Sequence, residues 1–184
     1  MQNINRLVGH YRTAISLLTA LAFLALSKPS LKWMVAGIPF VILGESIRTW
    51  ASGCLNKEYQ EVTAHGPYSM TRNPLYVGNF FLGVGFTLMG GRPEWVIVFL
   101  ALFYVIYRST ILDEENTLTR VFGEAYLDYK AKVPRFLPRF QKHAFEPGRF
   151  HWERVYKHRE YNAWLGIGLL MLLMGLLSYF RMEP

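Results

Sequence analysis

The chain has 184 residues, of which 52% are hydrophobic, 16% aromatic and 18% charged. This composition is more apolar than that of a typical soluble domain and favours a membrane protein of one domain. The net charge of +7 comes from basic residues spread between apolar runs, which argues against nucleic acid and favours anionic lipid headgroups as the counter-charge. The single cysteine, Cys54, and five histidines without ligand spacing exclude an internal disulfide and give no indication of a metal.

Five apolar runs follow one another at residues 11–26, 33–50, 75–89, 95–112 and 164–180. Each is near the lower limit of the ~17–25 residues that cross a bilayer as a helix. The first run lacks a small-residue cleavage site, so we expect a retained helix and not a signal peptide. Short links at 27–32 and 90–94 join the first four runs into two helical hairpins. The sequence therefore predicts an all-α integral membrane fold with five transmembrane helices.

Basic residues are unevenly distributed over the connecting segments. The 113–161 loop carries ten Lys and Arg residues, whereas the 90–94 turn carries only Arg92. The positive-inside rule then predicts a cytosolic 113–161 loop, with the 51–73 segment on the same face and the carboxyl terminus outside. Two polar blocks at 66–78 and 113–129 thus share the cytosolic side, and the expected location is the cytoplasmic (inner) membrane.

The first polar block leads into the third apolar run at Asn73-Pro74. Asparagine is expected to cap the free amides of a helix, and proline fits its first position. Glycines 78, 83 and 85 follow within the same run. In a membrane helix such residues permit close approach of a neighbouring helix or a ligand, and helix packing is the ordinary interpretation.

The second polar block begins near the end of the fourth run, where Arg108 is followed by Asp113, Glu114 and Glu115. Charges at a membrane boundary are costly unless they are paired, hydrated or functional, and snorkelling is the ordinary explanation for the arginine. The apolar and aromatic residues from Leu118 to Tyr129 have helical spacing, which predicts an interfacial amphipathic helix.

Between His65 and Pro138 these blocks resemble the isoprenylcysteine carboxyl methyltransferase and phospholipid methyltransferase superfamily of integral membrane enzymes. The resemblance rests on the order and spacing of several short blocks: Gly66-Pro67-Tyr68, Arg72-Asn73-Pro74-Leu75-Tyr76-Val77-Gly78, Gly83-Val84-Gly85, Glu114-Glu115-Asn116-Thr117-Leu118, Phe122-Gly123, Tyr126, Tyr129 and Val133-Pro134-Arg135. At Asn73 the superfamily usually has histidine. The resemblance implies one domain (1–184) with a catalytic core at about 33–140 and an added transmembrane helix at about 162–180.

The resemblance further implies S-adenosylmethionine as methyl donor, bound in a pocket that a cytosolic helical and loop segment closes. The residues implied at the cofactor are Arg72, Asn73, Pro74, Tyr76, Gly78, Gly83, Gly85, Glu114, Glu115, Leu118, Tyr126 and Pro134. The catalytic residues expected are Arg108, Asp113 and Glu114. A glutamate of the pair would bind the amino group or ribose hydroxyls of the cofactor, and Tyr76 with nearby amides would take its carboxylate.

The acceptor is expected to be a lipophilic small molecule or a lipidated substrate. Arg108 would orient an acceptor carboxylate by bidentate pairing, whereas an amine acceptor would need an acid such as Asp113 to take its proton. The leading prediction is a carboxylate of the isoprenylcysteine type, followed by a phospholipid amine and then a thiol. A protein of another class, a non-catalytic membrane scaffold or transporter subunit, is the remaining alternative.

Overall fold

The computed structural model describes residues 18, 21–56, 61–141, 144 and 149–182. Every regular element in this part is helical, as predicted, and residues 21–26 are helical as well. The elements are α2 (Leu31–Cys54), the 3₁₀ turn η1 (Gly66–Ser69), α3 (Pro74–Met89), α4 (Glu94–Phe122), α5 (Glu124–Lys132), α6 (Trp152–Lys157) and α7 (Tyr161–Met182). Most of the predicted first run at 11–26 lies outside the described residues.

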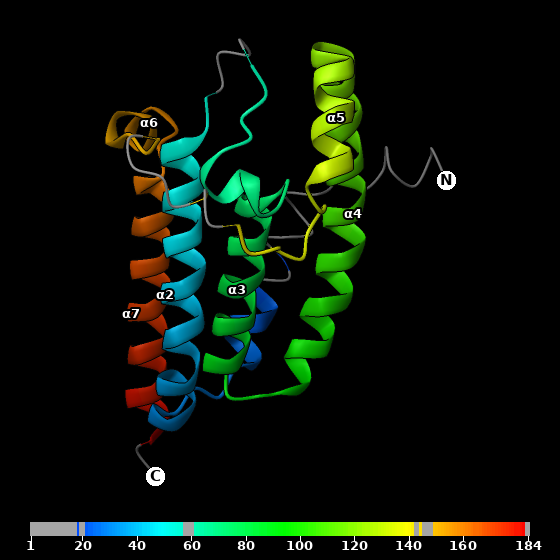
Figure 1. Cartoon of the computed structure of the whole chain (residues 1–184). Coiled ribbons are helices and arrows are strands. Elements are labelled where there is room, and N and C mark those ends of the chain that lie inside the picture. The colour runs from blue at the N-terminus through cyan, green and yellow to red at the C-terminus, as the bar shows by residue number, and fades with distance from the viewer. Residues whose placement is uncertain (1–17, 19–20, 57–60, 142–143, 145–148, 183–184) are drawn as a thin grey trace.

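The long helices run side by side, with α3 between α2 and α4 and with α7 against α2 (Figure 1). The 27–30 link, the α3–α4 turn and the end of α7 share one end of the molecule, where the Lys28 amide donates to the Gly90 carbonyl at 2.7 Å. The short elements η1, α5 and α6 gather at the opposite end. This arrangement puts the two polar sequence blocks together.

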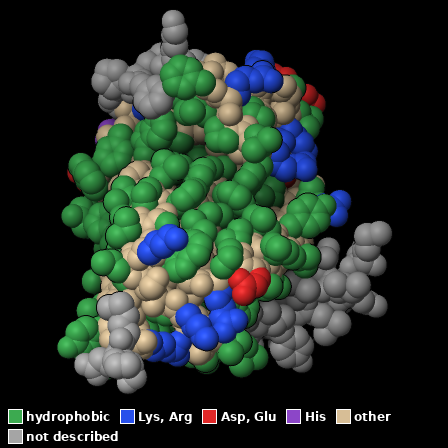
Figure 2. Space-filling model, turned by 90° about the horizontal axis from the view of Figure 1, so that it is seen from below, with side chains coloured by type: hydrophobic (Ala, Val, Ile, Leu, Met, Phe, Trp, Pro, Cys, Tyr) green, Lys and Arg blue, Asp and Glu red, His purple; other side chains and the backbone are tan. Residues whose placement is uncertain are grey.

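Two of the described helices, α4 and α7, are long and apolar enough to cross a membrane. Only 11% of the apolar window of each is buried within the protein, so most of that surface needs an apolar environment. Figure 2 shows hydrophobic side chains over most of the end opposite α5 and α6 as well. Helix α3 is shorter, at 16 residues. These features support membrane association, and the five-span arrangement remains a prediction.

Glycines hold α2 and α3 at close range. A Cβ atom placed on Gly78 would lie 2.7 Å from the Gly44 carbonyl oxygen, and one on Gly85 would lie 2.9 Å from that of Gly37. Gly83 faces α4 instead, because its Cβ would meet the Phe99 ring at 2.1 Å. The contacts at Gly78 and Gly85 leave no room for a larger residue and let the backbones of α2 and α3 touch. The three predicted glycines of α3 therefore lie in helix contacts.

Two local predictions were wrong. Helix α4 does not end near residue 112 but continues to Phe122. The 113–122 segment has several good helix formers and contains no glycine or proline that would end the helix. The break comes at Gly123, whose φ of +55° is unfavourable for other residues, so the predicted amphipathic helix is divided between α4 and α5. Asn73 precedes α3 but its side chain makes no capping hydrogen bond; its Nδ2 group donates instead to the Arg135 carbonyl.

The α6 segment covers the end of α2. The carbonyl groups of residues 52–54 meet the backbone N–H of His151 at 3.0 Å, the guanidinium of Arg154 at 3.2 Å and Nδ1 of His158 at 3.1 Å. The last carbonyls of a helix have no partner within the helix itself. The tail of the chain therefore completes α2, next to the end of the molecule where the polar blocks meet.

Candidate active site

Hydrogen bonds join the first polar block to α5 and to the segment that follows it. Hydrogen bonds between the segments at 68–73 and 129–139 include those from the Arg72 amide to the Pro134 carbonyl (2.9 Å), from the Arg139 amide to the Met70 carbonyl (2.9 Å) and from the Tyr129 hydroxyl to the Tyr68 carbonyl (2.6 Å). The Asn73 side-chain amide adds a donor to the Arg135 carbonyl at 2.8 Å. Asn73 thus holds the segment after α5 in place.

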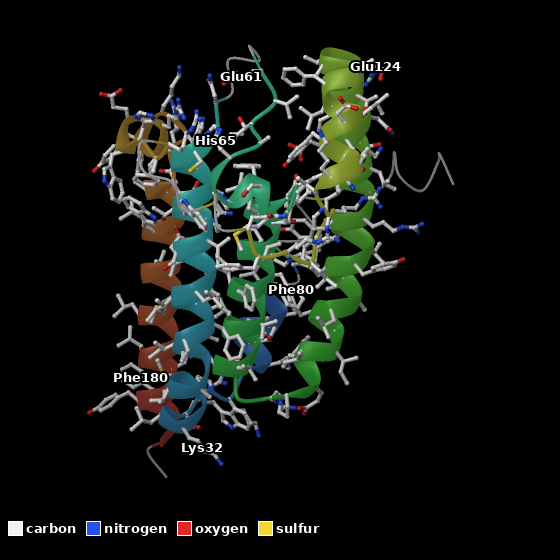
Figure 3. The ribbon with its side chains drawn as sticks, in the orientation of Figure 1. Lys32, Glu61, His65, Phe80, Glu124 and Phe180 are labelled. Carbon is white, nitrogen blue, oxygen red and sulfur yellow. The ribbon has the colours of Figure 1, made fainter. Side chains whose placement is uncertain are left out.

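A pocket of about 190 Å³ lies where these segments meet. In Figure 3 the loop that carries Glu61 stands opposite the end of α4 and α5, where Glu124 is labelled. The pocket lining includes seven of the predicted site residues: Arg72, Asn73, Tyr76, Glu114, Glu115, Leu118 and Tyr126. Leu55, Val62, Leu75, Phe122 and Tyr129 also contribute to it. The fold thus brings residues of both polar blocks to one cavity.

Glu115 is the electrostatic centre of the pocket wall. It is 2% exposed, and Arg135 binds it through two hydrogen bonds of 3.0 Å each. Arg72 and Lys130 approach the same carboxylate at 3.3 and 3.7 Å. Since three cations surround one anion, the wall keeps a positive excess, and the Glu115 oxygens are already engaged. The pairing also raises the pKa of Arg135.

Arg72 lines the pocket and has unused hydrogen-bonding capacity. Its side chain is 7% exposed, and within the described part its Nε and Nη1 atoms have no hydrogen-bond partner. Buried guanidinium donors without a partner are costly. An anion in the pocket would satisfy them, because the planar guanidinium fits a carboxylate.

Glu114 has different surroundings from its neighbour. The residue is exposed, lines the pocket and accepts one hydrogen bond of 2.9 Å from the Tyr76 hydroxyl. Its carboxylate has room for further donors, such as an ammonium or hydroxyl group. The pocket thus presents cationic and anionic groups on separate side chains.

Tyr126 adds a neutral donor. Burial, with a smaller contribution from the charge of Glu115, raises the pKa of Tyr126 to about 12. Burial likewise raises the pKa of Tyr129, whose hydroxyl donates to the Tyr68 carbonyl. Both hydroxyls therefore stay protonated at neutral pH and serve as donors rather than bases.

A second cavity of about 530 Å³ opens between α3 and α4, a size within the range of small-molecule sites. Its walls are largely aromatic, and Phe80 lies between the two helices (Figure 3). Arg108 also lines it, with its guanidinium carbon 5.8 Å from the Tyr104 ring. Arg135 lines this cavity and binds Glu115 of the first pocket. We call this second cavity the aromatic groove. Its lining residues are Phe80, Leu100, Phe103, Tyr104, Tyr107, Arg108, Ile111, Arg135 and Phe136.

The other predicted site residues line neither cavity. Pro74 is buried at the first turn of α3, and Pro134 contributes only its carbonyl to the Arg72 amide. Asp113 is exposed and lines neither cavity. Among the described residues, no group of three or more His, Cys, Asp or Glu side chains is placed to hold a metal ion.

The fold brings to the site two residues that had no predicted role, Arg135 and Lys130. Arg135 follows Pro134 in one of the recognised blocks, so that block was the available signal. Its pairing with Glu115 joins residues 20 positions apart, which neither periodicity nor spacing reveals.

The phospholipid methyltransferase family profile matches residues 33–125, about half of the chain. The chain belongs to this family. The match ends inside α5 and covers Arg72, Glu114 and Glu115, but leaves out Arg135, α6 and α7.

Curated relatives agree with this assignment. Protein-S-isoprenylcysteine O-methyltransferase of Rattus norvegicus is 33% identical over 125 residues, which cover 60% of this chain and 44% of the rat protein. The nickel-cobalt-cadmium resistance protein NccN of Alcaligenes xylosoxydans xylosoxydans is 30% identical over 138 residues, 72% of this chain and 64% of that protein. Protein-S-isoprenylcysteine O-methyltransferase B of Arabidopsis thaliana is 28% identical over 146 residues, 70% of this chain and 74% of its own length.

The chain thus spans less than half the length of the rat relative. No solved structure matches it significantly.

Proposed function

We propose that this protein is an S-adenosylmethionine-dependent methyltransferase that methylates a lipophilic carboxylate at the membrane surface. Family membership supports methyl transfer. The single observation that carries the fuller proposal is the placement of two cavities on either side of Arg135, one lined by polar groups and the other by aromatic ones.

The first pocket, lined by Arg72, Glu114 and Glu115 and called here the polar pocket, fits the methyl donor. The orphan donors of Arg72 suit the carboxylate of its methionine part, while Glu114 suits its ammonium group or ribose hydroxyls. Leu118, Phe122 and Tyr126 offer apolar and aromatic surface for the adenine. When bound, the cofactor supplies an electrophilic methyl group on a positively charged sulfur. Glu115, whose oxygens are engaged by Arg135, Arg72 and Lys130, acts here by holding those cations in position.

The aromatic groove suits the apolar part of an acceptor. It opens along α4, whose apolar surface is largely unburied within the protein, so a lipid-dissolved molecule has lateral access to it. The groove has two charged residues, Arg135, which is paired with Glu115, and Arg108. Arg108 would pair with an acceptor carboxylate and orient it.

The chemistry of a carboxylate acceptor agrees with the groups present. A carboxylate oxygen forms a bond to the methyl carbon while the carbon–sulfur bond breaks, which leaves a methyl ester and a neutral sulfide. No proton is released, so no base is needed. The demands on the protein are alignment and exclusion of water, which the two cavities serve.

A phospholipid amine is the second candidate acceptor, supported by the description of the matching family. That reaction releases a proton, and Asp113, the acid expected to take it, lines neither cavity. The carboxylate therefore stays the leading acceptor. In either case we place the chain in the cytoplasmic membrane with five spans and with its pocket facing the cytosol, as the basic 113–161 loop predicts.

The test is methyl transfer by the purified protein in lipid nanodiscs. Radiolabelled S-adenosylmethionine would be offered with a prenylated cysteine that has a free carboxylate, with the same compound blocked as its ester, and with phosphatidylethanolamine. We expect label only with the free carboxylate, in a form that alkali releases as methanol. Labelling of phosphatidylethanolamine alone would move the proposal to the amine reaction, and labelling of none would contradict it.

Arg108→Ala tests the acceptor role in the same assay. An orienting contact made chiefly in the transition state appears in kcat, so turnover should fall by about a hundredfold with little change in cofactor affinity. Arg108→Lys should recover little, because lysine lacks the planar fork. Arg120→Ala is the matched control, since Arg120 is an exposed arginine further along α4. Normal turnover in Arg108→Ala would show that this arginine only snorkels.

A further inference from the structure

A buried ion pair joins the carboxyl-terminal helix to the core. Glu160 precedes α7 and is 6% exposed, and its Oε1 atom accepts a hydrogen bond from Nη2 of Arg48 on α2. The Ser52 hydroxyl donates to the other carboxylate oxygen at 2.9 Å. A buried charge held by two partners is costly to disturb, so Glu160 defines where the Arg48 guanidinium lies.

Arg48 in turn reaches α3. Its Nη1 atom donates to Oδ1 of Asn79, which fixes the orientation of that amide. Nδ2 of Asn79 then faces the Tyr107 hydroxyl on α4, at 3.3 Å. Three helices, α2, α3 and α4, and the turn before α7 are linked in this way by polar contacts that begin at Glu160.

Tyr107 stands beside both cavities. Its ring packs edge-on against Tyr76, with centroids 5.0 Å apart, and Tyr76 donates to Glu114 in the polar pocket. The same ring stacks on Phe103 at 4.2 Å and lines the aromatic groove. A shift of Tyr107 would therefore disturb Tyr76 on one side and the groove wall on the other.

We propose that Glu160 is a positioning residue for the site: it orders Tyr107 and Tyr76, and through them Glu114, by way of Arg48 and Asn79. Glu160 touches neither cavity, and it lies outside both the family match at 33–125 and the predicted core at 33–140. The carboxyl-terminal segment thus contributes to the site without lining it. The consequence for cofactor affinity rests on the proposed function, whereas the ordering of Tyr107 does not.

The surroundings of Arg48 predict the effect of breaking its ion pair with Glu160. Arg48 has a second acid within reach, because its Nε atom lies 3.6 Å from Oε2 of Glu45. Without the charge of Glu160, the guanidinium is drawn toward Glu45 and away from Asn79. The amide of Asn79 is then free to turn, and its contact with the Tyr107 hydroxyl is weakened.

Two measurements on Glu160→Gln test this inference. Fluorine NMR of protein labelled with 3-fluorotyrosine, with the signal of residue 107 assigned from Tyr107→Phe, reports the ring directly. We expect that signal to shift or broaden. The dissociation constant for S-adenosylhomocysteine should rise about fivefold, a size typical of mutations that act through a contact network.

Trp164→Phe is the matched control. Nε1 of Trp164 donates to the Thr49 hydroxyl at 3.2 Å, so this variant also weakens the α2–α7 contact but leaves Arg48 and Asn79 in place. It should lower the melting temperature without moving the Tyr107 signal or the dissociation constant. If both variants change the signal and the affinity alike, Glu160 is merely structural and the inference is overturned.

Asn79→Ala interrupts the path inside the core and leaves the Arg48–Glu160 pair intact, so it serves if Glu160→Gln does not fold. It should reproduce the shifted Tyr107 signal and the weaker binding, and adding Glu160→Gln should change them little further, since residues on one path are not additive. An unmoved Tyr107 signal in Asn79→Ala would overturn the inference. Failure of the wild-type protein to bind S-adenosylhomocysteine would instead contradict the proposed function.

Discussion

Glu114 and Glu115 are neighbours in sequence but face different surroundings. Consecutive residues of a helix point in directions about 100° apart, so only Glu115 reaches Arg72, Lys130 and Arg135, while Glu114 meets Tyr76 at the open pocket. We infer that Glu114 contacts the ligand and that Glu115 holds the cations of the wall.

Exchanging each glutamate for glutamine should separate these roles. Glu114→Gln should weaken binding of S-adenosylhomocysteine about tenfold with little change in melting temperature, since one charge-assisted hydrogen bond is lost. Glu115→Gln should lower the free energy of unfolding by about 3 kcal/mol, because Arg72 is left buried without its counter-charge. Calorimetric titration and thermal unfolding measure both effects. The reverse pattern, a stable Glu115→Gln that does not bind and a normal Glu114→Gln, would refute the assignment.

Asn73, where the superfamily usually has histidine, works here as a donor. It is 8% exposed and its amide donates to the Arg135 carbonyl, a bond that the N–H of a histidine ring can also make. Asn73→His should therefore change turnover less than about threefold and add no pH dependence near ~6.5. Asn73→Ala, which removes the donor, should weaken cofactor binding. A large gain in rate with a new pH dependence in Asn73→His would point to a missing proton acceptor and an amine or thiol substrate.

At the scale of the elements, the contact between α2 and α3 depends on glycines rather than on large apolar side chains. Gly37 and Gly44 face Gly85 and Gly78 across the two helices, with backbone atoms at the contact. Glycine destabilises a soluble helix, but here it permits backbone contact over most of the length of α3. Because α3 also begins at the pocket, this contact positions Asn73 and Tyr76.

Gly85→Ala should destabilise the protein by about 1–3 kcal/mol, since the added Cβ would lie 2.7 Å from a Val41 methyl and 2.9 Å from the Gly37 carbonyl oxygen. Gly168→Ala on α7 is the matched control, because its Cβ would meet no atom within 4 Å, and it should be neutral or slightly stabilising. Thermal unfolding in the same detergent measures both. Equal melting temperatures would show that the helices part easily and that the contact contributes little.

At the scale of the whole molecule, the helices separate a polar end that holds the pocket from a largely apolar end that also carries several Lys and Arg side chains (Figure 2). The described parts of the basic 113–161 loop lie with η1 and the pocket, and the α3–α4 turn lies at the other end with the end of α7 (Figure 1). This is the arrangement that the charge distribution predicts for a chain whose pocket faces the cytosol.

Cysteine labelling checks that topology. Leu137 and Phe180 are 80% and 67% exposed, and the native Cys54 is 1% exposed, so a membrane-impermeant maleimide should report mainly on introduced cysteines. Leu137→Cys should react only in permeabilised cells, where the reagent reaches the cytosol. Phe180→Cys should already react in intact cells. Labelling of both from the same side would mean that α7 lies along the membrane and does not cross it.

The sequence by itself determined the helical class, the approximate places of α2, α3, α4 and α7, and the two polar blocks with most of the residues around the pocket. These follow from apolar periodicity and short motifs, which are local properties of the chain. Only the tertiary structure decided that Glu115 is enclosed by cations while Glu114 stays open, that the α3 glycines face α2 and α4, and that Asn73 holds the 133–139 segment instead of capping a helix. It also decided that Glu160 pairs with Arg48, a contact across 112 positions. Such pairings are set by how whole helices pack and by which buried charges then find partners, and no local pattern in the chain contains that information.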